Sequence, residues 1–245
     1  MRIAVVTDIH GNLTALEAVV VDLAQVAPDL VVQGGDLVAG GHRPAEVLDR
    51  VRGYGWSGVQ GNTDEMLWKP ELFDRFMEET PQLGHIWTLI FVQQAPATRE
   101  LLGAERLGWL RQVPLAWQGH DLAVVHAAPG NLWRAPMPDA SDGDLAATYG
   151  PLGCRLAAYG HIHRPFVRNL STSQRAFTVA NCGSVGMPFD GDPRASYLVV
   201  DDGVPAVRRV EYDVEREVRS LLQSNYPAAD DLAQTLRTGR YVSRP

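Results

Sequence analysis

The side chains best suited to chemistry in this sequence are aspartate, histidine and asparagine residues that follow predicted strands. They occur in five short segments, which are Asp8-Ile9-His10, Gly34-Gly35-Asp36, Gly61-Asn62, His126 and Gly160-His161-Ile162-His163. In open α/β sheets, binding sites form outside the carboxyl ends of the strands. We therefore expect the five segments to converge on one site.

These residue types predict a site for two metal ions. Carboxylate oxygen and imidazole nitrogen bind Mn, Fe, Zn and similar ions, and the candidates outnumber the ligands of one tetrahedral zinc. They suffice for two ions if Asp36 bridges them. Two ions about 3.5–4 Å apart can hold a hydroxide between them and bind phosphoryl oxygens, because a bound metal lowers the pKa of water from about 16 towards about 7. Such a hydroxide would attack phosphorus in an in-line displacement, so the pattern predicts hydrolysis of a phosphate ester.

The order of these motifs resembles that of the calcineurin-like metallophosphoesterases. Asp-x-His, Gly-Asp, Gly-Asn, a lone His and Gly-His-x-His follow one another, and residues 181–186 and 190–197 resemble the bacterial and archaeal phosphodiesterase branch. The resemblance runs from residue 1 to about residue 212. It implies an α/β fold in four layers, in which a two-sheet β-sandwich is flanked by helices and carries the metals at the sheet ends.

The resemblance also implies which residues bind each metal ion. One ion would take Asp8, His10, Asp36 and His163, and the other would take Asp36, Asn62, His126 and His161. We assign catalytic roles to Asp36, Asn62 and His126. Mn²⁺ is the first choice of cofactor because the ligands are oxygen and imidazole, and Fe, Ni and Zn fit nearly as well.

One position departs from the family pattern. Many members read Gly-Asn-His-Asp, where the histidine binds phosphate or protonates the leaving group, whereas this chain has Thr63 there. Threonine cannot act as a general acid near neutral pH, and such help is typically worth about 10²–10⁴-fold. We predict weak activity on esters with poor leaving groups. Asp64 has no histidine to orient and is expected to cap the following helix.

Two further residues are candidates for substrate binding beside Asn62. His42 lies in the loop after Asp36, and Arg194 could donate two hydrogen bonds to a phosphate, although a surface salt bridge is the simpler interpretation. Of the other histidines, His85 lies in an apolar run and is expected to be packed, and His120 is expected to be exposed in a hairpin turn.

Hydrophobic periodicity predicts the elements that position these residues. The expected strands are 2–7, 29–33, 56–60, 114–118, 121–125, 156–159, 165–168, 176–180, 196–200 and 205–212, and the expected helices are 13–26, one from Pro44, 213–223 and 226–237. Strand–helix–strand alternation implies parallel pairing with right-handed crossovers. Residues 63–112 look mostly helical, with breaks at Pro81 and Pro96, and are expected to cover the site as a cap-like insertion. Within them, 85–92 fits helix or strand, and we favour helix.

Composition is consistent with a single cytoplasmic domain spanning residues 1–245. The net charge is -7 and the pI about 5.5, which argues against a stable nucleic-acid complex, because nucleic-acid binders carry basic surfaces. The N-terminal apolar run is too short for a signal peptide, and no stretch approaches the ~18 apolar residues of a membrane helix. Two cysteines, Cys154 and Cys182, make no disulfide framework.

The sequence leaves two classes of function open. The first is a phosphodiesterase or phosphatase acting on a small phosphate ester or nucleotide; the resemblance also allows dinucleoside polyphosphates or phosphoproteins. The second is a catalytically weak metal-binding scaffold, or a nucleotide or phosphate sensor, on the same fold, and Thr63 gives this alternative some weight. Metal-dependent turnover distinguishes the two, and the oligomeric state stays open.

Overall fold

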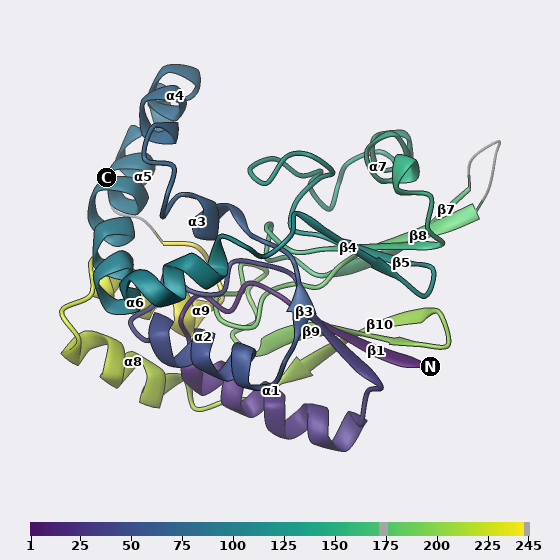
Figure 1. The fold of residues 1–245 in the computed structure, drawn as a ribbon, viewed down its shortest axis with the longest axis horizontal. Helices are drawn as coiled ribbons and strands as arrows, with labels where there is room; N and C mark the ends of the chain where they lie inside the picture. The colour runs from purple at the N-terminus through teal and green to yellow at the C-terminus, as the bar shows by residue number, and fades with distance from the viewer. Residues whose placement is uncertain (172–175, 243–245) are drawn as a thin grey trace.

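The computed structural model of the protein describes residues 1–171 and 176–242, and its elements form four layers (Figure 1). Two five-stranded sheets pack face to face, with strand orders β10-β9-β1-β2-β3 and β4-β5-β6-β8-β7. Helices cover the outer faces of both sheets. This arrangement confirms the expected α/β sandwich.

The first sheet combines parallel strands with an antiparallel pair at one edge. β1 pairs in parallel with β2, and antiparallel with β9. Ile3 and Val5 of β1 face the second sheet, whereas Ala4 and Val6 face the helices, because strand side chains alternate between faces. The strands are β1 (Arg2–Val6), β2 (Leu30–Gln33), β3 (Ser57–Gly58), β9 (Ala195–Asp201) and β10 (Val204–Val210).

Two crossover helices, α1 (Leu13–Val26) and α2 (Pro44–Gly53), cover the outer face of this sheet. The Asn12 side chain caps α1 by accepting from the Ala15 amide, and the helix stops at Ala27, which has a left-handed backbone. Leu16 and Val19 of α1 are fully buried. The first and last residues of α1 are therefore those predicted from the apolar spacing.

The second sheet has its own cover in α7 (Asp142–Tyr149). The sequence did not predict this helix; Ser141 caps it and Leu145 and Tyr149 bury its inner face. The hairpin turn before β5 lies at His120 and Asp121, which both have positive φ, one residue later than expected. The strands are β4 (Ala116–Gly119), β5 (Leu122–Val125), β6 (Leu156–Tyr159), β7 (Phe166–Ser171) and β8 (Ala176–Asn181).

The segment after β3 is helical, as expected, but two of its details differ. Pro96 does not break it, because a π-helical turn leads directly into the long helix that contains this proline; the helix kinks at Gly103 instead (φ 72°). His85 is exposed rather than packed. The elements are α3 (Asn62–Glu65), α4 (Leu72–Glu79), η1 (Pro81–Leu83), α5 (Gly84–Trp87), η2 (Thr88–Gln94) and α6 (Ala95–Leu110).

These helices gather at one end of the sandwich, together with α8 (Val214–Gln223) and α9 (Ala229–Thr238) (Figure 1). Tyr226, between α8 and α9, accepts a hydrogen bond from the Gly40 amide and contacts Thr98 of α6. This hydrogen bond links the segment between α8 and α9 to the loop after β2. Within the described ranges, no helix combines the length and hydrophobicity needed to cross a membrane.

Candidate metal centre

The carboxyl ends of β1, β2 and β6 point towards this helical end, and the predicted ligands meet there. Six of them are buried, and the seventh, His161, is partly exposed. Five have a left-handed backbone, with φ between 50° and 64°, and these are Asp8, His10, Asp36, His161 and His163. Such φ values are uncommon for residues other than glycine, and they cluster where a site constrains the chain.

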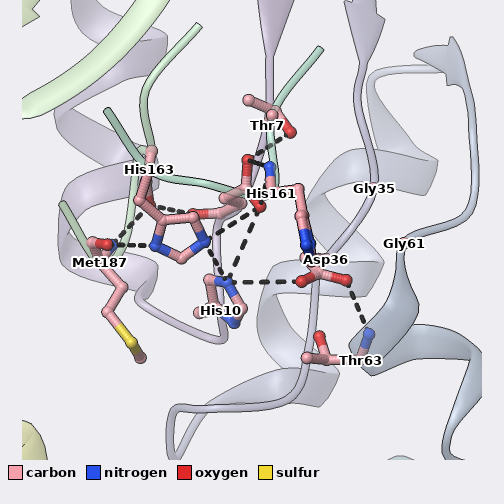
Figure 2. A network of polar contacts seen from close by, with 12 residues as sticks. Thr7, His10, Gly35, Asp36, Gly61, Thr63, His161, His163 and Met187 are labelled. Atoms are coloured by element: carbon pink, nitrogen blue, oxygen red, sulfur yellow. Dashed lines mark hydrogen bonds and ion pairs between the residues drawn. The ribbon is translucent and has the colours of Figure 1, made fainter. Parts of the chain in front are cut away.

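One half of the centre consists of Asp8, His10, Asp36 and His163, whose ligand atoms all lie within 4.8 Å of one another. His163 Nε2 is 3.1 Å from Asp8 Oδ1. His10 Nε2 is 3.7 Å from Asp36 Oδ2 (Figure 2). The Thr7 hydroxyl donates to Asp8 Oδ2 at 2.7 Å and fixes that carboxylate. Two carboxylates and two imidazoles thus share one small volume.

The other half extends from Asp36 to Asn62, His126 and His161. His126 Nε2 lies 3.5 Å from Asp36 Oδ2. The Asn62 side-chain oxygen lies 2.8 Å from His126 Nε2 and 2.9 Å from His161 Nδ1. Asp36 borders both halves, which is the position that the sequence assigned to a bridging carboxylate.

Backbone carbonyls fix the proton positions of three histidines. His10 Nδ1 donates to the Ala39 carbonyl, His126 Nδ1 to Gly34 and His163 Nδ1 to Met187. A carbonyl only accepts, so each Nδ1 carries the proton and each Nε2 of a neutral ring presents a lone pair. A backbone carbonyl bound to the far nitrogen is the usual support of a metal-ligating histidine.

The donor set therefore fits a cation. The Nε2 atoms of His10 and His163 face each other at 3.2 Å (Figure 2). Two lone pairs in that position repel, and a divalent ion that accepts both would remove the repulsion. The oxygen of Asn62 faces two imidazole nitrogens in the same way, and turning its amide over would point the NH₂ group at them instead. Carboxylate, amide oxygen and imidazole suit divalent first-row ions.

The pKa shifts of the histidines also favour binding of a cation. Burial lowers the pKa of His10, and lowers that of His161 to about 4, so both rings stay neutral and able to bind a metal. Burial alone would lower the pKa of His126, but the negative charges of Asp36 and Asp8 raise it overall. The centre thus attracts positive charge.

Two neighbours of Asn62 complete the surroundings. Asp64 is fully buried and its carboxylate accepts from the amides of Asp36, Leu37 and Gly61 at 2.9, 3.1 and 3.0 Å. Asp64 was expected to cap a helix that follows it, but it lies at the third position of α3 and accepts from the Gly61 amide at the start of that same helix. It also joins α3 to the loop that carries Asp36. The Thr63 amide donates to Asp36 Oδ1 at 2.9 Å, and its hydroxyl is buried without a partner in the described chain.

A cavity of about 190 Å³ opens over the centre. His10, Asp36, Asn62, His161 and His163 form its floor. Its walls come from η2 and the helix before it, and from residues 228–242. One part of these walls lies within residues 63–112, which were expected to cover the site, whereas no local pattern in the sequence pointed to residues 228–242.

The structure does not bring two predicted substrate-binding residues to this cavity. The His42 ring contacts Ser220 of α8 at 2.7 Å, on the buried side of that helix. The Arg194 guanidinium pairs with Asp192 at 2.6 Å, which is the simpler interpretation given above. Neither residue lines the cavity, so only Asn62 of the three keeps its expected place.

Comparison with known proteins agrees with this geometry. The family profile described as calcineurin-like phosphoesterase superfamily domain matches residues 1–202. An uncharacterized protein of Methanocaldococcus jannaschii is 29% identical over 97% of this chain and 98% of its own length. A metallophosphoesterase of Sphaerobacter thermophilus has a similar structure (TM-score 0.76, 27% identity, 98% of this chain and 99% of that one). A hypothetical protein of Pyrococcus horikoshii shares the fold (TM-score 0.80, 20% identity, 97% and 98%).

Proposed function

The chain belongs to the calcineurin-like phosphoesterase superfamily, and from this premise we propose that it hydrolyses phosphate esters with the help of two divalent metal ions. The position of Asp36 carries the proposal. Its Oδ2 lies 3.7 Å from His10 Nε2 on one side and 3.5 Å from His126 Nε2 on the other. One carboxylate that borders two sets of ligands is the arrangement that a binuclear centre requires.

Each ion would be held by four side chains. One would be held by Asp8, His10, Asp36 and His163, and the other by Asp36, Asn62, His126 and His161. When bound, the ions would polarise the phosphoryl group and make water acidic enough to act as a nucleophile near neutral pH. Mn²⁺ stays our first choice, with Fe, Ni and Zn as alternatives.

The chain's own residues have three tasks in this proposal. The carbonyls of Ala39, Gly34 and Met187 orient the imidazoles. Burial keeps His10 and His161 neutral, so that they hold cations rather than protons. Thr63 borders the cavity but supplies no acidic proton. The leaving group must therefore depart largely unprotonated, which favours leaving groups that are weak bases. Esters of acidic alcohols and phenols are therefore the expected substrates.

Hydrolysis of bis-p-nitrophenyl phosphate by metal-stripped protein, with and without Mn²⁺, tests the proposal. We expect turnover only with Mn²⁺, and its loss in Asp36→Ala. Asp74→Ala, at an exposed position of α4, is the matched control and should keep wild-type activity. Turnover that persists without any metal, or in Asp36→Ala, would overturn the proposal.

The scaffold or sensor role is the second candidate, and threonine at position 63, where many family members have histidine, favours it. A scaffold would bind Mn²⁺ stoichiometrically and turn over no phosphate ester with any divalent ion. A sensor would bind a phosphate compound tightly without cleaving it. Metal-binding calorimetry beside the turnover assay separates these outcomes from the enzyme.

A further inference from the structure

The walls of the cavity differ in chemistry from its floor. Ile86, Leu89 and Ile90 line it on the side of the helical insertion, and Leu232 and Tyr241 line it on the opposite side. Phe189 extends this surface, with its ring 4.3 Å from the ring of His163 and 5.4 Å from that of Tyr241. An apolar chamber therefore adjoins the ligand imidazoles.

Lysine and arginine side chains of residues 1–171 and 176–242 do not contribute to the chamber. Among the residues described, neither lysine nor arginine lines it, and Asp231 adds a carboxylate to the wall. Its neutral polar side chains are Asn62 on the floor and Thr63, Gln94 and Tyr241 around it. A polyphosphate chain extending beyond the metal centre would meet no positive side chain here, and Asp231 would repel it.

The volume of the chamber suits a small group. The cavity measures about 190 Å³, and an apolar cavity of about 150 Å³ is known to hold one benzene molecule. A single ring or a short branched chain therefore fits in the chamber, whereas the ribose hydroxyls of a nucleoside would meet mostly apolar walls.

We propose that this chamber binds the ester group of the substrate and selects a small, uncharged, apolar group, such as an aryl or short alkyl group, over nucleosides and polyphosphates. The assignment rests on the proposed function, since the phosphate must sit on the metal centre. Burial of the apolar group supplies the selectivity, because each buried CH₂ or ring carbon leaves water for an apolar wall.

Calorimetric titration of the Mn²⁺-loaded protein with non-hydrolysable phosphonates tests the assignment without turnover. Phenylphosphonate should bind at least about tenfold more tightly than methylphosphonate, as expected for burial of one ring. Adenosine 5′-monophosphate should bind more weakly than phenylphosphonate. Equal affinities for the two phosphonates, or tighter binding of the nucleotide, would overturn the assignment.

Three variants locate the effect in the chamber. Leu89→Trp fills it, and should bring the two phosphonates within about twofold of each other, because an overfilled site rejects the ring. Tyr241→Ala opens the opposite wall and should weaken phenylphosphonate binding while methylphosphonate binding is kept. Val92→Trp is the matched control, since Val92 is 54% exposed on the same helical turn, and it should leave the preference unchanged. A preference for phenylphosphonate that survives both chamber variants would refute the assignment.

Phosphonate binding and ester hydrolysis are measured independently, so the two proposals can be refuted one at a time. If phenylphosphonate binds preferentially but no phosphate ester is cleaved, the proposed hydrolase is wrong and the chamber assignment stands. If esters are cleaved but the phosphonates bind alike, the hydrolase stands and the assignment is wrong.

Discussion

Asp64 offers the sharpest test of how the centre is held in place. Its Oδ2 accepts from the amides of Asp36 and Gly61, and its Oδ1 accepts from the amide of Leu37. In Asp64→Asn, the amide oxygen can occupy the Oδ2 position and keep two of these bonds. The NH₂ group then faces the Leu37 amide, so two donors meet and neither is satisfied.

The size of the effect follows from this count. Each unsatisfied buried donor costs about 1–3 kcal/mol, so the two in Asp64→Asn should lower the free energy of unfolding by about 2–6 kcal/mol. Asp64→Ala loses all three bonds and should cost more, even if water partly replaces the carboxylate. Asp64→Ala releases the Asp36 amide, so its Mn²⁺ affinity should fall by about 10–100-fold, the usual loss when a partner of a metal ligand is removed. Asp64→Asn keeps that bond, so its Mn²⁺ affinity should fall less.

Urea denaturation of the metal-free protein measures the stability, and calorimetric titration with Mn²⁺ measures the affinity. Asp74→Asn, at an exposed position of α4, controls for the loss of a negative charge. If Asp64→Ala binds Mn²⁺ within about twofold of wild type while still losing stability, then Asp64 merely caps its helix. In that event, our inference that it positions the bridging carboxylate would be wrong.

Three other variants test separate parts of the chain. Thr63→His should restore the missing proton donor and raise bis-p-nitrophenyl phosphate turnover, by up to about 10²–10⁴-fold; a variant no faster than wild type contradicts this. Glu217→Leu should destabilise the protein by about 3–5 kcal/mol in urea denaturation, because the largely buried Arg43 loses its carboxylate, and a loss below about 1 kcal/mol would show that Arg43 finds water instead. Burial lowers the pKa of His42 from 6.5 to about 4, so the unfolded chain takes up a proton before the folded one, and stability should fall as the pH drops from 6.5 towards 4. His42→Gln should flatten that part of the stability profile measured by urea midpoints, and an unchanged slope would assign it to other groups.

Much of the fold was predictable because local signals agreed with tertiary packing. The helix Leu13–Val26 has its predicted bounds, since Asn12 caps it and the apolar spacing matches the face it buries. Strands were found within three residues of their predicted ends where apolar runs met polar turns. The ligands converge because the carboxyl ends of β1, β2 and β6 share one end of the sandwich.

Other features depend on contacts that no local pattern encodes. The helix continues through Pro96 because a wide π-helical turn precedes it, whereas proline alone predicts a break. The helix Asp142–Tyr149 is short and contains glycine, so its weak periodicity was missed. Ile86 and Tyr241 line the same cavity although they are far apart in the sequence. The positions of His42 and Arg194 depend on contacts with Ser220 and Asp192.

The left-handed backbone of five predicted ligand residues has a consequence for protein design. Asp8, His10 and Asp36, with both histidines of the Gly-His-x-His segment, hold φ values that ideal strand ends and turns avoid. A designer who grafted the seven side chains onto regular loops would reproduce the donor atoms and still point them the wrong way. A transplant would have to carry the loops whole, including the carbonyls of Gly34, Ala39 and Met187, as a rigid cassette on its own strands.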